Sequence, residues 1–269
     1  MATIAETAPV SSGRTDHLSG TPRAHAVDRW IYVFTAASFI AIILTGFIPD
    51  SIGLLADVRA GQRPPLPLVE HVHAVLMGSF LLLLLAQTVL VATGRNTLHM
   101  RLGLVSMALV PAMVVAGFLL AATNYHGVLA AAQARPELQP VVGILDNILL
   151  LQLRIGILFP IFIWIGLRAR RQEPGLHKRM MILATAVALP AGIDRITWLP
   201  TTLPASPLTT DLWLLVAVSP LLLWDLYRNR YLHRAWLIWL GLMVPVALLT
   251  NLLWDTAWWH GTARAMMGA

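Results

Sequence analysis

Hydrophobic residues in this chain gather in long runs that short polar stretches separate. A helix needs about 20 mostly apolar residues to cross the roughly 30 Å hydrocarbon core of a bilayer. Seven runs come close to this requirement, at residues 30–48, 74–92, 102–122, 148–167, 180–199, 212–226 and 236–254. The pattern therefore predicts an all-α fold, a polytopic membrane helix bundle of about seven transmembrane helices.

The polar stretches divide the chain into three parts. Residues 1–27 are polar and lack the apolar core of a signal peptide, so we expect a disordered cytoplasmic tail there. Residues 28–260 form the seven-helix domain, with a core four-helix unit at about 70–199. Residues 261–269 are expected to form a short outer tail.

Composition agrees with a membrane protein. The chain is 57% hydrophobic and 12% charged, whereas a soluble domain is about half apolar and about a quarter charged. The formal net charge of +6 comes from basic residues in short loops beside the apolar runs, so we expect a lipid bilayer and no nucleic acid as partner. The chain has no cysteine, which excludes disulfides, thiolate metal sites and cysteine nucleophiles.

Basic residues concentrate in alternate loops. They lie near Arg95 and Arg101, within 168–179 and within 228–234, and the opposite loops hold most of the acids. Because cytoplasmic loops carry the excess of Lys and Arg, the N-terminus is predicted to be cytoplasmic and the C-terminus to lie outside.

Three of these basic loops contain a Leu-His pair followed by Arg one or two residues later. The histidines are His99, His177 and His233. Imidazoles on neighbouring helices are good ligands for haem iron or a divalent metal. The same residues at helix starts also serve as anchors at the level of the lipid headgroups, and the sequence leaves both interpretations open.

A second group of candidate ligands lies near the predicted outer face. Glu70, His71 and His73 open the second run, and His126 ends the third. Positions two apart in a helix point about 200° from each other, so His71 and His73 chelate together only if the chain is extended at His71. A metal site of these residues with Asp146 is one hypothesis, and a hydrogen-bonded interfacial cluster is the other.

Arg154 lies inside the fourth run, at the depth of the hydrocarbon core. An unpaired arginine there costs several kcal/mol, on the order of 3 or more, so we expect it to meet an anion. The expected partner is the carboxylate or phosphate of a bound molecule, or one of Asp194, Glu70, Asp146 and Asp255. Three side chains complete the predicted polar cluster: Gln87, which shares a helix face with His73, Asn147, which shares one with Arg154, and Asp194.

Several functional motifs are absent from the sequence. It has no glycine-rich phosphate loop, no G-x-S-x-G and no H-E-x-x-H. Lys178 is the only lysine and lies in a basic loop, which excludes a retinal Schiff base in the last helix.

The order of features over residues 70–195 resembles the cytochrome b561-like superfamily of two-haem transmembrane electron carriers. The segments that carry the resemblance are HVHAVLMGSFLLLLLAQTVL, GRNTLHMRLGLVSMAL, LLLQLRIGILFP and PGLHKRMMILA. It is also similar to bacterial membrane families with the same histidine, glutamine and Leu-His-x-Arg-Leu-Gly signature, which implies a multi-pass protein of the bacterial inner (plasma) membrane.

The resemblance implies histidine pairs across the four-helix core, one pair for each haem. His99 and His177 match the pair on the cytoplasmic side, and His73 or His71 matches half of the outer pair. The other half would lie where the fourth helix begins, but Asp146 and Asn147 stand there. An outer haem would therefore require His126 as a substitute.

These observations lead to three functional hypotheses. The first is a redox protein with a b-type haem or a histidine-bound divalent metal, which works with a quinone or a small reductant and uses Arg154 to bind a propionate or the substrate. The second is a transporter or receptor-like protein that binds a small molecule at the polar cluster around Arg154. The third is an accessory membrane subunit without chemistry of its own.

Overall fold

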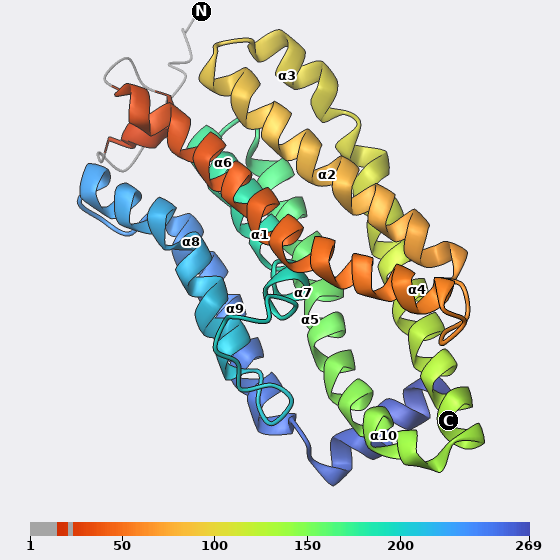
Figure 1. Cartoon of the computed structure of the whole chain (residues 1–269). Coiled ribbons are helices and arrows are strands. Elements are labelled where there is room, and N and C mark those ends of the chain that lie inside the picture. The colour runs from red at the N-terminus through yellow and green to blue at the C-terminus, as the bar shows by residue number, and fades with distance from the viewer. Residues whose placement is uncertain (1–14, 21–23) are drawn as a thin grey trace, which may run out of the picture.

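The computed structural model describes residues 15–20 and 24–269, and this part of the chain is an all-α bundle (Figure 1). Within it, six helices are long and apolar enough to cross a membrane. They are α1 (Ala26–Arg59), α2 (Leu68–Ala92), α4 (Ser106–Ala134), α5 (Gln139–Ala169), α8 (Leu208–Asn229) and α9 (Arg234–Leu253). The protein is therefore a multi-pass helical membrane protein that contacts the lipid bilayer.

The fifth predicted span is not one continuous helix. It corresponds to α6 (Pro174–Ala186) and α7 (Pro190–Ile193), which are joined by a tight turn. In this turn the N–H groups of residues 187–189 donate to carbonyls three residues earlier. Pro190 has no N–H and its ring clashes with the carbonyl four residues before it, so a regular α-helix ends here. The prediction of a single helix over 180–199 is wrong.

The α6 helix lies at the centre of the bundle. It packs against α5, α1, α8 and α9, and the side chains of Met180 and Leu183 have no exposed surface. The surrounding helices instead carry exposed apolar residues, such as Leu82 on α2 and Leu248 on α9, which suits contact with lipid. Because irregular backbone is tolerated at membrane depth only where protein covers it, the break between α6 and α7 is placed in the protected position.

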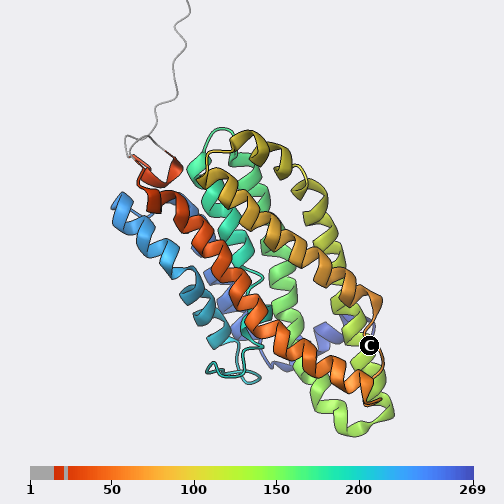
Figure 2. The ribbon, with the colours of Figure 1, turned by 45° about the horizontal axis from the view of Figure 1, so that its top comes forward.

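Short helices mark the two ends of the bundle (Figures 1 and 2). The histidine end consists of η1 (His17–Ser19), α3 (Asn96–Gly103), the start of α6 and the turn between α8 and α9. The opposite end contains η2 (Pro136–Leu138) and α10 (Ala257–Met267), which packs against α5 and α4. The loops that share a basic character in the sequence therefore share one end of the molecule.

Both predicted tails are folded where the structure describes them. Residues 1–14 and 21–23 lie outside the described residues, but η1 packs onto the bundle and Leu18 is 1% exposed in the main core. At the other terminus, α10 continues to Met267, so the expected outer tail is mostly helix. The contacts that hold η1 and α10 are with helices distant in the sequence, which local composition does not indicate.

The α1 and α7 helices approach each other closely at Gly46 and Gly192. A Cβ atom added to Gly46 would lie 2.1 Å from the carbonyl oxygen of Gly192. Small residues allow this kind of close contact between helix backbones in membrane proteins. The contact fixes the short α7 helix against the long α1 helix.

Candidate functional site

His99 and His177 lie together at the histidine end. His99 is on the short α3 helix and His177 is on the first turns of α6. The centres of their imidazole rings are 6.3 Å apart, and the ring planes are inclined by 69°. The structure thus brings together the two residues that the resemblance pairs on one side of the membrane.

A backbone carbonyl lies beside the Nδ1 atom of His177. The His177 Nδ1 atom is 2.8 Å from the carbonyl oxygen of Gly166 on α5. The His99 Nδ1 atom is buried without a hydrogen-bond partner among the described residues, and the backbone carbonyl of Gln87 lies near the His99 imidazole. An imidazole that donates from Nδ1 keeps its lone pair on Nε2, which is the arrangement common in metal-bound histidines.

The surroundings of His99 favour its neutral form. Burial, and secondly the charge of Lys178, hold the pKa of His99 below its usual value. The side-chain oxygen of Gln87 is also buried here without a partner among the described residues. One imidazole of the pair and the neighbouring Gln87 side chain are therefore incompletely satisfied, as expected where a further group binds.

His233, the third Leu-His histidine, has a different role. It caps the N-terminus of α9, where its Nδ1 atom accepts a hydrogen bond from the N–H of Ala235 at 3.1 Å. Its Nε2 atom lies 3.7 Å from a carboxylate oxygen of Asp16. These contacts make His233 part of an ionic network and not of the imidazole pair.

His233 lies at the edge of a network of ionic and polar side chains that the sequence analysis did not predict. We call this network the N-terminal clasp, and it consists of Asp16, Lys178, Arg179, Asp225 and Asn229. The Arg179 side chain is fully buried and donates to Asp225 at 2.6 and 2.7 Å and to Asp16 at 3.0 and 2.8 Å. Lys178 donates to the Ser19 carbonyl, and Asn229 donates to both carboxylates. The clasp holds η1 against α6 and α8, and an aspartate inside an apolar run was the available signal for it.

Stability is expected to fall in acid because of His233. Burial, and secondly the charge of Arg179, lower the pKa of His233 from its model-peptide value of 6.5 to about 4, against the opposing effect of Asp16 and Asp225. Between pH 6.5 and 4, His233 therefore binds a proton more readily in the unfolded chain than in the folded protein. The free energy of unfolding should fall by roughly 2–3 kcal/mol as pH drops through this range.

His233→Asn is the variant that checks this expectation, because asparagine also caps a helix N-terminus. Thermal unfolding measured from pH 7 to pH 4 should show a weaker pH dependence in His233→Asn than in the unmodified protein. His126→Asn, which changes an exposed histidine at the opposite end, should keep the original dependence. Parallel pH curves for all three proteins would contradict the assignment.

Arg154 has a partner that the sequence did not suggest. Its Nη1 atom donates to Asp211 of α8 at 2.5 Å, whereas Asp194, Glu70, Asp146 and Asp255 were the expected carboxylates. Asp194 instead accepts a hydrogen bond from Thr210 at 2.7 Å. The Nε and Nη2 atoms of Arg154 are buried without a hydrogen-bond partner among the described residues.

Asp146 and Asn147 anchor α10 to α5. Asp146 is fully buried and accepts hydrogen bonds from Tyr125 at 2.6 Å, and its second oxygen lies 2.9 Å from His260 Nδ1. The side-chain oxygen of Asn147 accepts from the backbone N–H of Asp255 at 2.9 Å. Asp146 thus contacts α4 and α10, and Asn147 contacts the residue two positions before α10 begins.

The candidate metal ligands remain a prediction. Glu70, His71 and His73 all lie in α2, so the extended conformation that would let both histidines chelate together is not present. His73 packs against Gly117 of α4 and its Nδ1 atom has no partner among the described residues, while His126 is exposed. No group of three or more His, Cys, Asp or Glu suited to a metal ion occurs in residues 15–20 and 24–269.

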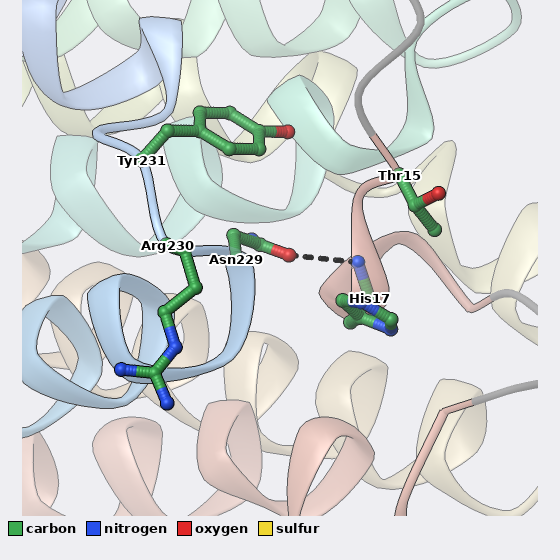
Figure 3. Close-up of a pocket in the computed structure, with 5 residues that line it drawn as sticks. All are labelled: Thr15, His17, Asn229, Arg230 and Tyr231. Atoms are coloured by element: carbon green, nitrogen blue, oxygen red, sulfur yellow. Dashed lines mark hydrogen bonds between the residues drawn. The ribbon is translucent and has the colours of Figure 1, made fainter.

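The larger of two described cavities lies at the histidine end and has a volume of about 380 Å³. Its lining residues are Thr15, His17, Asn229, Arg230 and Tyr231. Figure 3 shows the backbone of His17 bonded to Asn229, and the guanidinium of Arg230 directed away from Tyr231. The smaller cavity, beside the break between α6 and α7, is apolar and about 10 Å³, which is at most the space of one water.

Three polar centres therefore stand out: the imidazole pair, Arg154 with Asp211, and Asp146 with α10. Comparisons with protein-family models, curated proteins and solved structures found no match. Of the three centres, the imidazole pair is the one that brings two histidine rings together. The remaining predicted residues, Gln87 and Asp194, lie beside the first and the second centre respectively.

Proposed function

We propose that this membrane protein is a redox protein that binds one b-type haem, or a divalent metal, between His99 and His177. The separation of the two rings is the observation that carries the proposal. A metal ion held between two ring nitrogens, at about 2.0–2.1 Å from each, separates the ring centres by roughly 6 Å. The observed separation of 6.3 Å agrees with this value.

The donor chemistry of the pair also suits haem. His99 is held neutral by burial, and neither Nε2 atom has a hydrogen-bond partner among the described residues. The carbonyl of Gly166 favours a proton on Nδ1 of His177 and so leaves the lone pair of its Nε2 atom for a ligand. When bound, haem would supply one-electron transfer to or from a quinone or another small reductant.

The protein side of the proposal concerns orientation and charge. The Gly166 carbonyl orients His177, and the charges of Lys178 and Arg170 act on this imidazole. Because Lys178 is held by the N-terminal clasp, Arg170 is the cation of the two that would be free for a haem propionate. Arg154 precedes Gly166 by twelve residues, about 18 Å along α5. In this proposal Arg154 therefore lies outside the haem site.

Loop charge supports an orientation with the histidine end in the cytoplasm of a bacterial cell. Five arginines at this end have no ion pair among the described residues: Arg95, Arg101, Arg168, Arg170 and Arg171. Unpaired basic residues beside spans favour the cytoplasmic side. The haem would then lie near the cytoplasmic surface of the inner membrane.

An absorption spectrum of the purified protein, with metal analysis, tests the proposal. Protein reconstituted with haem should show an intense Soret band that is lost in His99→Ala and in His177→Ala. His126→Ala removes an exposed histidine at the opposite end and should keep the band. A preparation that stays colourless and metal-free after reconstitution, while its thermal unfolding remains cooperative, would refute the proposal.

A further inference from the structure

The guanidinium of Arg154 lies in the interior of the bundle with only part of its hydrogen-bonding capacity satisfied. The residue lies at the middle of α5 and is 2% exposed. One of its nitrogens, Nη1, donates to Asp211, whereas Nε and Nη2 have no acceptor among the described residues. Buried charged donors without an acceptor are expensive, so this arrangement points to a missing partner.

The two unused nitrogens lie on one edge of the guanidinium. The N–H groups of Nε and Nη2 are parallel and form the fork that binds two oxygens of one carboxylate or phosphate. Asp211 does not use this edge, because its contact is with Nη1 and its second oxygen lies 3.4 Å from the Asn251 amide nitrogen. The free edge therefore matches an acceptor group with two oxygens.

We propose that this edge of Arg154 binds the carboxylate of a small organic anion. Local charge favours a carboxylate over a phosphate. Arg154 and Asp211 neutralise each other, and Asp194 is near enough to feel the charges of both, so a doubly charged phosphate would meet two carboxylates. A singly charged carboxylate adds the least repulsion while it satisfies both donors.

This site is independent of the proposed haem. Its residues come from α5, α8 and α9, and it lies about 18 Å along α5 from the Gly166 contact of His177. The binding reaction needs no redox step. Failure of the haem experiment would therefore leave the carboxylate site untouched, and the reverse also holds.

Titration of the purified protein with sodium acetate, followed by calorimetry and by thermal unfolding, tests the site. Sodium phosphate and sodium chloride at equal ionic strength serve as comparisons. We expect saturable binding of acetate and weaker or no binding of phosphate. Arg154→Lys should weaken acetate binding about tenfold or more, because lysine keeps the charge but lacks the fork.

Asp211→Asn separates a binding role from a structural one. It removes a negative charge that neutralises Arg154 and repels a bound carboxylate, so acetate should bind at least about threefold more tightly. The matched control is Arg234→Gln, which removes an exposed arginine paired with Glu173 at the histidine end and should leave acetate binding unchanged. Non-saturable effects that are equal for all three salts, tighter phosphate than acetate, or weaker acetate binding in Asp211→Asn would overturn the proposal.

Discussion

Replacing Arg179 with methionine is expected to lower the free energy of unfolding by about 3–5 kcal/mol. The change leaves the fully buried Asp225 carboxylate, and Asp16 beside it, without their cation. The loss of one partner of a buried ion pair is costly because the remaining charge has been removed from water and is no longer compensated. Unfolding in detergent, followed by circular dichroism, measures the effect.

Arg234→Met is the matched control for this prediction. Arg234 lies at the same end and pairs with Glu173, but its side chain is 58% exposed and that of Glu173 is 42% exposed. An exposed ion pair contributes about 0–1 kcal/mol, so this variant should unfold almost like the unmodified protein. Equal losses in both variants would show that the clasp contributes no more than a surface pair.

Gly46→Ala is expected to destabilise the protein by about 1–3 kcal/mol or more. The added methyl group would lie 2.1 Å from the backbone oxygen of Gly192, and a backbone atom cannot rotate away as a side chain can. The helices α1 and α7 must therefore separate, which loosens the broken segment at the centre of the bundle. The midpoint of thermal unfolding reports the loss.

Gly53→Ala on the same helix should have the opposite sign. No heavy atom lies within 4 Å of the position that a Cβ atom would take at Gly53. Alanine is preferred to glycine inside a helix by about 0.5–1 kcal/mol, so this variant should be neutral or slightly more stable. Similar effects of the two substitutions would contradict the close contact between α1 and α7.

Hydropathy predicted the long helices because a membrane span depends on local composition. The runs at 30–48 and 74–92 lie within α1 and α2, which extend beyond them. The run at 180–199 failed because an apolar segment buried among helices has the same composition as one that faces lipid. Pro190 stands at the break, but prolines such as Pro111 and Pro160 lie inside helices that remain continuous, so a proline alone does not predict the break.

Pairing across the bundle was harder to predict than helix position. The carboxylate on Arg154 belongs to Asp211, 57 residues further along the chain, and nothing in the local sequence selects it over Asp194. Arg179 lies in a basic loop of the sequence, yet the packing of α6 places it in the core. His99 and His177 lie together in the structure, and it was the resemblance that supplied this long-range expectation.

The N-terminal clasp also sets an order of events during biosynthesis. Asp16 is translated before any span, but Asn229, to which it is bonded, follows 213 residues later. At about 5–20 residues per second, the ribosome needs roughly 10–40 s after Asp16 to reach Asn229. The segment around Asp16 can therefore dock onto α8 only after α8 has been synthesised. This docking is a late step in the assembly of the bundle.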